Sequence, residues 1–498
     1  MSGQLHTNFV YGLTGERQEM LVQDNRILSR AASIHAPGVP IVDHGGKTLI
    51  PPFIDSHCHI LPTGLDLLSL NLGRSDSVQE VLDTVRDERK RIGSGWLVAV
   101  HYDQNRYGRH LTLEELDSVS AGEPTLLRHV SGHSALVNSR ALQLAGISAS
   151  TKDPDGGRFE HSPDGCLTGV LLENAMGEVM RHVPRPSVEF MVQAILAAGE
   201  SMRSYGISCA SDMHTGFMDL EGELDAYRIA AERGCKIKTR LYLRWSKVYG
   251  PRAMSPEVLR EKLQALEKTG DQVKVAGTKI FADGAIGSGT AAIYGAYAGQ
   301  PESPRGYSGQ LIYSTERLDQ MVKTATDAGY QVSVHSIGDY STDCVMDAFE
   351  KSGAPERHRI EHAMMLSDAQ IERMAKLNCY VNMQPEFLVR FGQTYKNQLG
   401  PERAFRLKRM RSVLDAGLRL SLNSDRPIVS GDPRTGIALT TNRPEGFDPA
   451  ETITLQEALR GYTVEAAAAN RDAAPTGTLD PGAPAEFLVF GIPSAQPD

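Results

Sequence analysis

The chain has 498 residues, of which 41% are hydrophobic and 23% are charged, a composition typical of a large folded protein. Its formal net charge is −9, from 52 basic and 61 acidic residues, and no long lysine or arginine run could follow a nucleic-acid backbone or an anionic bilayer. The sequence contains no recognisable signal peptide and no apolar stretch long enough to cross a membrane. We therefore expect a cytoplasmic protein with no nucleic-acid partner and no membrane partner.

Both ends of the chain predict short β-strands. Residues 8–12, 20–29 and 41–52 are strand-like runs separated by turn-forming residues, and residues 477–491 have the same character. This pattern predicts that both ends build one small β unit, and we expect it to be a composite β-sandwich domain of residues 1–48 and 430–498.

Between the two ends, apolar β-branched runs alternate with helical patterns. Helices are predicted at 318–329, 368–378 and 409–417, the last two ending at or before a residue that favours a turn. The predicted buried strands are 48–57, 206–213, 237–245, 273–284, 330–339, 359–365, 379–385 and 418–425. Eight strands joined by helical crossovers predict an α/β fold, a (β/α)8 TIM-like barrel over residues 49–429.

Two more strand-like runs, 95–104 and 125–138, lie between the first and second barrel strands. They predict an inserted subdomain over residues 61–205, after the first barrel strand. We expect this subdomain to cover the barrel mouth.

Polar residues stand at the ends of several predicted barrel strands. The chemistry of such barrels is carried out at the C-terminal ends of the strands. The residues at these ends are His57 and His59 on the first strand, Lys279 on the fourth, His335 on the fifth, His362 on the sixth and Asp425 on the eighth.

The first pair, His57 and His59 in IDSHCHI, predicts part of a metal site. Alternation along a strand places both rings on one face, and imidazole nitrogens suit zinc and similar ions. A catalytic zinc keeps one position open for water, whose pKa it lowers from about 15.7 to about 7. An isolated His-x-His motif in a strand is more often two packed or surface histidines than a metal site. Taken alone, His335 or His362 would be explained as a buried, hydrogen-bonded histidine. Their joint occurrence at successive strand ends favours the metal.

Seven motifs along the chain extend this interpretation. They are DSHCH, YDQN, SGHSALVNSRAL, TKIFADGAIGSGTAA, VSVHSIGD, RIEHAMM and NSDRPI. In this order they resemble the amidohydrolase superfamily, and within it the YtcJ-like branch that includes N-substituted formamide deformylases. The resemblance implies a metal-dependent hydrolase of a C–N bond, acting on a linear amide, formamide or N-acyl group of a small molecule. A homodimer is the expected assembly.

The resemblance also implies which residues bind metal. One or two Zn2+ ions are expected, or other divalent transition metals, with His57 and His59 on the more buried ion and His335 and His362 on the more exposed one. Lys279 matches a lysine that carries a carboxylate from carbon dioxide and bridges both ions.

An unmodified Lys279 ammonium would be repelled by two cations, so the physics favours carboxylation or a single-metal site. A surface or salt-bridged lysine is the alternative at this position. Glu173 is a second candidate ligand, although its flanks predict a helix of the insert.

Asp425 is implied as the catalytic proton shuttle. It would take a proton from metal-activated water as that water attacks the carbonyl carbon, and deliver it to the leaving nitrogen. An Asx turn before a proline-containing loop is the structural alternative.

Five residues are predicted to bind substrate: Asp103, Gln104 and His133 of the insert, His214 after the second barrel strand, and Arg426. Arg426 could pair with a substrate carboxylate or phosphate, or narrow the pocket.

Other functions fit the same residues. Hydrolysis of a cyclic amide, deamination, and ester or lactone hydrolysis use the same attack by activated water. A non-catalytic scaffold relative and a binding protein for a small ligand are the alternatives outside the enzymes.

Overall fold

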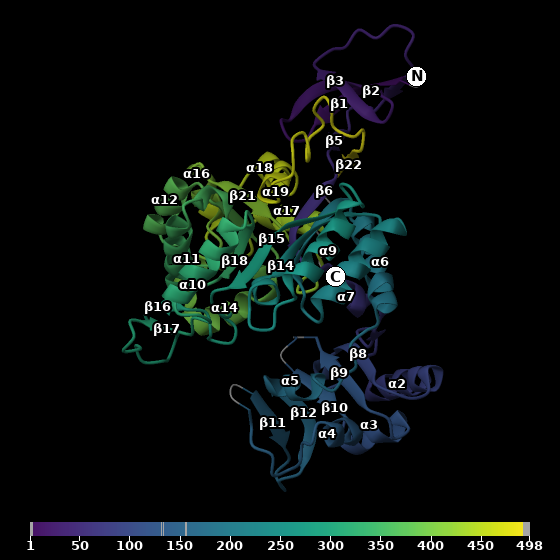
Figure 1. Cartoon of the computed structure of the whole chain (residues 1–498), viewed down its shortest axis with the longest axis vertical. Helices are drawn as coiled ribbons and strands as arrows, with labels where there is room; N and C mark the ends of the chain where they lie inside the picture. Colours follow the sequence, from purple (N-terminus) through teal and green to yellow (C-terminus); the bar gives the residue numbers. More distant parts are fainter. Residues whose placement is uncertain (1–2, 131, 133, 155–156, 492–498) are drawn as a thin grey trace. The chain divides into compact units, whose positions relative to one another are not determined.

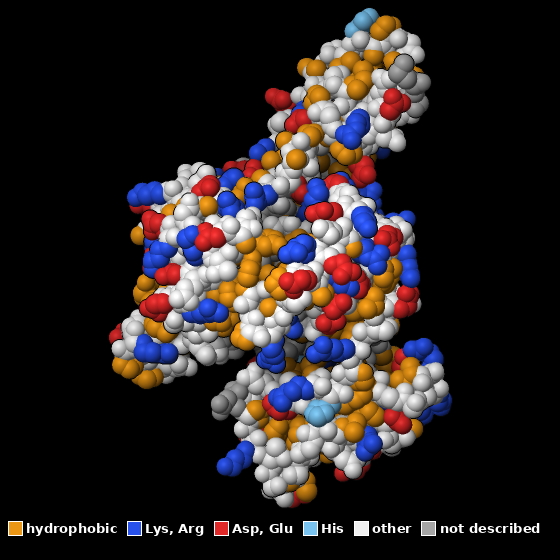
Figure 2. All heavy atoms as spheres, viewed as in Figure 1, with side chains coloured by type: hydrophobic (Ala, Val, Ile, Leu, Met, Phe, Trp, Pro, Cys, Tyr) orange, Lys and Arg blue, Asp and Glu red, His pale blue; other side chains and the backbone are white. Residues whose placement is uncertain are grey.

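A computed structural model describes residues 3–130, 132, 134–154 and 157–491 (Figure 1). The chain forms two compact units, one of Met1–Leu61 with Ala198–Asp498 and the other of Pro62–Ala197. Among the described residues, no helix combines the length and the apolar character that a bilayer crossing requires. On the face shown in Figure 2, basic and acidic side chains are interspersed.

Eight parallel strands form the barrel of the first unit. Their order in the sheet is the order in which they occur in the chain, and each overlaps one of the eight predicted runs. They are β6 (Phe53–Cys58), β13 (Ile207–Thr215), β14 (Lys238–Arg244), β15 (Val273–Phe281), β18 (Gln331–Ser336), β19 (Arg359–His362), β20 (Tyr380–Met383) and β21 (Arg419–Leu422). The last strand also contacts the first, so the sheet nearly closes. The predicted TIM-like α/β fold is confirmed.

Helices connect the barrel strands. The main ones are α7 (Leu220–Glu232), α9 (Pro256–Glu267), α10 (Thr315–Asp327), α11 (Asp339–Ser352), α12 (Asp368–Leu377) and α16 (Met410–Asp415). At the start of α12, Ser367 and Gln370 each accept a hydrogen bond from the other's backbone N–H, a capping box. Asn378 (φ 53°) and Gly417 (φ 77°) follow α12 and α16 in the left-handed conformation that ends a helix, as the sequence predicts.

The two ends of the chain share a six-stranded sheet. It contains β1 (Gly3–Tyr11), β2 (Glu16–Gln23), β3 (Arg26–Ala31), β4 (Ile41–Asp43), β5 (Thr48–Ile50) and β22 (Leu488–Phe490). The C-terminal strand β22 pairs antiparallel with β5, with Leu488 opposite Ile50. That this sheet forms a sandwich stays a prediction.

The residues between the barrel and β22 are helical, which differs from the β domain predicted from residue 430 onward. They form α17 (Pro433–Thr441), α18 (Leu455–Gly461) and α19 (Val464–Ala469). Helices α18 and α19 contact β21, and α19 also contacts β6. Their apolar residues, such as Leu459 and Ala466, are fully buried. Burial of these faces therefore packs the helices against the barrel.

The second unit is a six-stranded sheet with helices. Its strands are β7 (Leu70–Asn71), β8 (Leu97–Tyr102), β9 (Thr125–His129), β10 (Ser134–Val137), β11 (Gly157–His161) and β12 (Leu167–Glu173). Its helices include α2 (Val78–Ile92), α3 (Leu113–Ser120), α4 (Ser139–Leu144) and α5 (Ala175–Met180). One apolar cluster contains Val81 of α2 and Leu116 of α3, and another contains Leu142 of α4 and Val179 of α5. That this unit covers the barrel mouth stays a prediction.

A buried histidine gives the barrel a pH-dependent stability. His358 precedes β19, and its Nδ1 accepts the Val332 N–H at 3.1 Å while its Nε2 lies 2.9 Å from Thr326 Oγ1. Burial, together with the charges of Arg357 and Arg471, lowers the pKa of His358 to about 3. Because the unfolded histidine titrates near 6.5, its contribution to stability is present above pH 6.5 and is lost as the pH falls toward 3.

We expect the free energy of unfolding to fall by about 2 kcal/mol between pH 7 and pH 5 from this histidine alone. The variant His358→Asn keeps an acceptor near the Nδ1 position but has no group that titrates in this range, so this pH-dependent loss should disappear. The difference in the free energy of unfolding between the two proteins should therefore become smaller as the pH falls. Urea unfolding at several pH values measures it, with the exposed His161→Asn as control. Parallel pH profiles for the unsubstituted protein and His358→Asn would contradict the prediction.

Candidate metal centre

The predicted ligands gather at one end of the barrel. Parallel strands bring their C-terminal ends to the same mouth. The residues there are His57 at the end of β6 and His59 just after it, Lys279 near the end of β15, His335 in β18, His362 at the end of β19, and Asp425 after β21.

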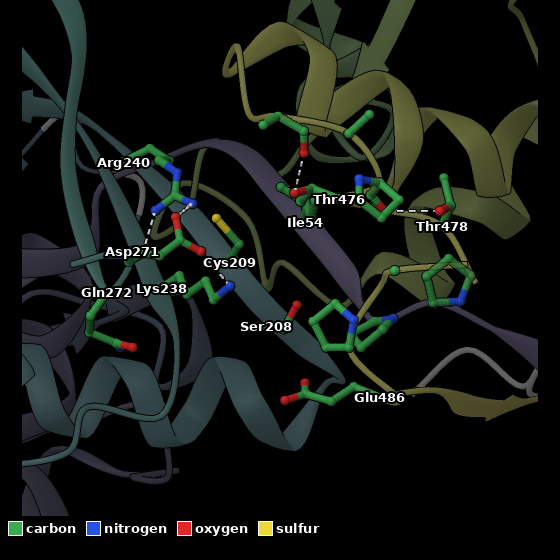
Figure 3. Close-up of a pocket in the computed structure, with 18 of the residues that line it drawn as sticks. Ile54, Ser208, Cys209, Lys238, Arg240, Asp271, Gln272, Thr476, Thr478 and Glu486 are labelled. Carbon is green, nitrogen blue, oxygen red and sulfur yellow. Dashed lines mark hydrogen bonds and ion pairs between the residues drawn. The ribbon is translucent and has the colours of Figure 1, made fainter. Parts of the chain in front are cut away.

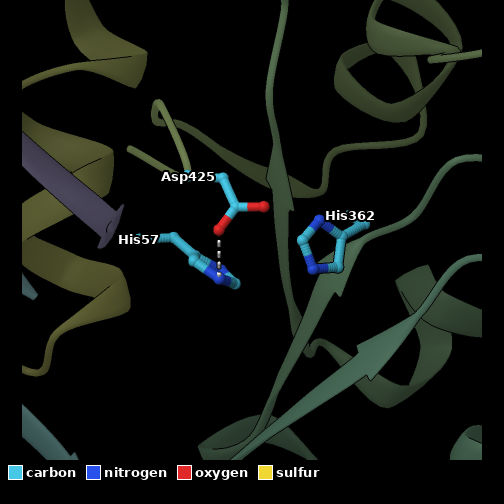
Figure 4. A group of neighbouring side chains, drawn as sticks. All are labelled: His57, His362 and Asp425. Atoms are coloured by element: carbon cyan, nitrogen blue, oxygen red, sulfur yellow. Dashed lines mark ion pairs between the residues drawn. The ribbon is translucent and has the colours of Figure 1, made fainter. Parts of the chain in front are cut away.

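Three of these side chains lie close enough to share an ion. His57, His362 and Asp425 each offer one donor atom, and these atoms lie within 4.8 Å of one another (Figure 4). Asp425 Oδ1 also lies 3.4 Å from His57 Nε2 and 2.9 Å from His59 Nε2. The rings of His335 and His362 have centroids 4.5 Å apart. The structure therefore brings together the four predicted histidines and the aspartate.

The backbone holds the first and last strand ends together. The Asp425 N–H donates to the His57 carbonyl, and the His59 N–H donates to the Arg426 carbonyl, both at 2.7 Å. His362 (φ 73°) and Asp425 (φ 60°) adopt the left-handed conformation, which is uncommon outside glycine. Strained backbone of this kind occurs preferentially at functional sites because the surrounding structure must hold it.

Glu361 orients the His57 ring. Its Oε2 lies 2.6 Å from His57 Nδ1, and a carboxylate only accepts, so Nδ1 carries the proton and Nε2 is left with a free lone pair. The Arg359 guanidinium pairs with Glu361, and Ser333 Oγ donates to Glu361 Oε1 at 2.8 Å. Although burial raises the pKa of Glu361, the charges of Arg359 and Lys279 hold it below its usual value.

Gln384 orients the His362 ring in the same way. Its Nε2 donates to Asn423 Oδ1 at 2.7 Å, and its Oε1 accepts from the Lys408 ammonium at 2.8 Å. The same Oε1 lies 3.0 Å from His362 Nδ1, which must therefore donate. His362 Nε2 is thus left without a proton, as a metal ligand requires.

His335 presents its other nitrogen. Its Nε2 lies 3.0 Å from the Gly284 carbonyl, to which it donates, so Nδ1 is the atom left for a metal. Burial, followed by the charge of Lys279, lowers the pKa of His335 to about 4. Burial likewise holds the pKa values of His57 and His362 well below 6.5. All three rings are neutral near pH 7, the form that binds metal.

Lys279 is a buried amine without a hydrogen-bond partner among the described residues. The residue is 2% exposed, its Nζ lies 5.2 Å from the centroid of the Phe281 ring, and burial lowers its pKa to about 8. His59 Nδ1 is likewise buried without a hydrogen-bond partner in the described structure. Unsatisfied buried polar atoms are costly and rare, so the open His59 nitrogen fits a site completed by a cation.

Two of the residues predicted to bind substrate, His214 and Arg426, belong to the first unit, and only His214 lies beside the histidine cluster. The His214 ring centroid lies 5.7 Å from that of His59, and its buried Nε2 has no hydrogen-bond partner in the described part of the chain. The Arg426 guanidinium instead donates to Ser201 Oγ at 2.7 Å and lies over the Tyr205 ring. Packing explains this placement of Arg426, and its contact with substrate stays a prediction.

The remaining candidate site residues belong to the second unit. Asp103 Oδ1 accepts from the Asn105 N–H at 3.1 Å, and Gln104 Oε1 is buried without a hydrogen-bond partner in the described structure. His133 lies outside the described residues. Glu173 ends strand β12 and helix α5 begins at Ala175, so the helix predicted for its flanks is found on the C-terminal side only. The pairing of β12 with β10 and β11 determines this conformation.

Comparison with known proteins identifies the class. The sequence profile of the amidohydrolase family matches residues 41–496. YtcJ of Bacillus subtilis (strain 168) is 28% identical over 99% of this chain and 95% of its own. The N-substituted formamide deformylase of Arthrobacter pascens is 28% identical over 95% of this chain and 90% of its own. An uncharacterised metal-dependent hydrolase from Pyrococcus furiosus superposes with a TM-score of 0.77, at 27% identity over 98% of both chains.

The fold and these relatives define a hydrolase. The chain belongs to the amidohydrolase family, in the branch of YtcJ and the N-substituted formamide deformylase. The resemblance inferred from the seven motifs is confirmed.

Sequence reasoning missed the residues that orient the ligands. Alternation in RIEHAMM places Arg359 and Glu361 on one face of β19, which could have suggested an interior ion pair. Nothing in the sequence indicates that Glu361 meets His57, 304 positions away. The sequence around Gln384, NMQP, likewise does not indicate that this residue orients His362.

Glu361 provides a test of ligand orientation. We expect Glu361→Gln to lower metal affinity about 10- to 100-fold, because the amide retains an acceptor for His57 but loses the charge that balances Arg359. Competition with a chromophoric chelator measures the affinity, and thermal unfolding reports whether the variant is folded. Ser333→Ala, which removes a neutral hydrogen bond to the same carboxylate, should have a smaller effect. Equal effects of the two substitutions would contradict the assigned role.

Proposed function

We propose that the protein is a metal-dependent amidohydrolase that cleaves a C–N bond of a small molecule, with a linear amide, formamide or N-acyl group as the leading substrate. The observation that carries the proposal is the pair His57 and His362. Each has its Nδ1 engaged by an acceptor, and each ring lies beside Asp425. The formamide deformylase among the relatives supports the choice of bond.

His57 and His59 would hold the more buried ion, and His335 and His362 the more exposed one, with zinc as the leading metal. Imidazoles and a carboxylate are a donor set that suits zinc and similar ions. When bound, the metal would activate water and polarise the carbonyl oxygen of the substrate.

Asp425 would move the proton. Although burial raises its pKa, a hydrogen bond from His59 and the charge of Lys279 hold the value below the usual one, so the carboxylate is ionised and able to accept. It would take a proton from the attacking water and deliver it to the nitrogen as the C–N bond breaks. His214, beside His59, would contact the substrate.

Lys279 would be carboxylated. A pKa of about 8 leaves roughly a tenth of the amine uncharged at pH 7, and only the uncharged amine attacks carbon dioxide. Nζ forms a bond to the carbon and releases a proton, and the resulting carbamate carries one negative charge. Negative oxygens at this position would offset the charge of bound cations.

We expect bicarbonate to assist metal loading through Lys279. Metal-free protein reloaded with zinc should regain metal and activity several-fold more completely with bicarbonate than in buffer free of carbon dioxide. Elemental analysis and turnover measure the recovery. In Lys279→Met, bicarbonate should make no difference, and an equal benefit in that variant would contradict the proposed carbamate.

A substrate panel tests the reaction class. Zinc-loaded protein should hydrolyse formamides, linear amides or N-acyl compounds with a higher kcat/KM than cyclic amides, deaminase substrates, esters or lactones. Turnover of lactones without turnover of any amide would overturn the leading choice. A protein that carries metal but turns over no compound of any class would favour a scaffold or a binding protein. The homodimer and the cytoplasmic location are also part of the proposal, and light scattering of the purified protein checks the former.

A further inference from the structure

The first unit contains a second cavity, at the opposite end of the barrel from the metal centre. It has a volume of about 590 Å³, within the usual range for small-molecule sites. Its wall includes Ile54 of β6, Ser208 and Cys209 at the start of β13, and Lys238 at the start of β14. Since the strands are parallel and the metal ligands follow their C-terminal ends, a ligand in this cavity would not reach Asp425.

The charge of the cavity wall is opposite to that of the protein. Five lining residues are cationic and two are acidic, whereas the whole chain has 52 basic and 61 acidic residues. The cationic residues are Arg26, Arg203, Lys236, Lys238 and Arg240, and the acidic ones are Asp271 and Glu486. A concave wall of one sign concentrates its field and attracts ions of the opposite sign.

A single carboxylate pairs with several of these cations. Asp271 lies 2.5 Å from the Lys238 ammonium and 3.0 Å from the Arg240 guanidinium, and Lys274 pairs with it at 2.5 Å. Although burial raises the pKa of Asp271, hydrogen bonds from the two lysines and the charge of Arg240 lower it to about 2. Arg240 has a second partner in Asp472, at 2.6 Å. The cationic side chains at the cavity wall therefore outnumber the carboxylates that pair with them.

Two further cations are free to meet a ligand. The Lys236 side chain is exposed and has no ion pair or hydrogen bond in the described structure, and the Arg203 side chain has only a long contact with Glu486 there, at 3.6 Å. In Figure 3, Lys238 and Arg240 lie on one side of the cavity and Thr476 and Thr478 on the other.

Much of the remaining wall is apolar, beside polar residues such as Ser208 and Thr476. It includes Pro51, Pro52, Pro475 and Pro484. A ligand that fits this wall has an anionic group for the cations and a carbon body for the prolines.

We propose that this cavity binds a small organic anion, of which a phosphate monoester is the leading class, at a site separate from the metal centre. The concave shape favours a small molecule over an extended nucleic acid. Arginine and lysine at the wall supply the charge-assisted hydrogen bonds that phosphate oxygens accept.

Calorimetric titration of the full chain tests the proposal, with inorganic phosphate and phenyl phosphate as the probes. Both should bind saturably at one site per chain outside the metal centre, more weakly at higher salt, and phenyl phosphate should bind more tightly because the prolines contact its ring. The double substitution Lys236→Ala with Arg203→Ala should weaken binding about tenfold, since it removes two cations and leaves Glu486 unpaired. Glu486→Gln should tighten binding about threefold by removing a negative charge.

Two controls locate the site. Lys268→Ala removes an exposed lysine outside the cavity and should leave binding unchanged. His57→Ala, which disables the metal centre, should also bind both probes as the unsubstituted protein does. The proposal is overturned if neither anion binds saturably, or if binding disappears in His57→Ala but survives the double substitution. Binding of single-stranded DNA without binding of either small anion would also overturn it.

Discussion

Asp425→Asn is expected to lower kcat by about 100- to 10,000-fold, the range over which a positioned proton-transfer group contributes. Asparagine has nearly the shape of aspartate, so the backbone hydrogen bond to His57 and the left-handed turn should persist. The amide cannot accept the proton of the attacking water, and the leaving nitrogen then departs without one. Steady-state turnover at saturating zinc measures the loss, and elemental analysis of the same sample reports its metal.

The metal measurement separates two roles of this residue. Asp425 Oδ1 lies 2.9 Å from His59 Nε2, close enough to the histidines to act as a ligand as well as a proton shuttle. If excess zinc restored full turnover to Asp425→Asn, the carboxylate would be a ligand only. The exposed Asp415→Asn, which changes a charge remote from the site, should keep both metal and rate.

His57→Ala is expected to remove most of the bound metal. The unsubstituted protein, purified without chelator, should carry about one to two zinc-like ions per chain, and the variant close to none. His57 is 1% exposed and its Nδ1 is engaged by Glu361, so the substitution removes a nitrogen that is already oriented for binding. Turnover should fall with the metal, as it should when a chelator strips the unsubstituted protein.

His335→Ala provides the comparison for His57→Ala. Because His335 would hold the more exposed ion, its loss should lower the metal content less. Identical metal contents in the two variants would show that the proposed division between two ions is incorrect. His161→Ala, an exposed histidine of the second unit, serves as the control and should retain all metal.

Much of the barrel could be predicted from the sequence because it depends on local patterns. Each of the eight apolar runs overlaps a barrel strand, and helices α12 and α16 end where Asn378 and Gly417 allow the left-handed turn. Burial on both faces requires continuous apolar runs, which can be recognised without knowledge of neighbours. The C-terminal helices were missed because what places them is contact with β6 and β21, not their own pattern.

The candidate site could be predicted in part. The metal-ligand types were evident from histidines and an aspartate at strand ends, since parallel strands direct those ends to one mouth. Their orientation was not evident, because Glu361 and Gln384 act on rings 304 and 22 positions away. The direction of Arg426, toward Ser201 and Tyr205, likewise depends on packing.

The sequence by itself determined the order of the strands, the residue types at their ends and membership of the amidohydrolase family, since each is written in local spacing and composition. Only the tertiary structure decided which nitrogen of His57, His335 and His362 is left for a metal, and that Lys279 is buried with no hydrogen-bond partner among the residues the structure describes. The tertiary structure also brought five cationic side chains from distant parts of the chain, among them Arg26 and Arg240, to the wall of one cavity. The reason is physical: hydrogen bonding, burial and electrostatic potential are sums over neighbours in space, and the sequence does not specify those neighbours until the chain has folded.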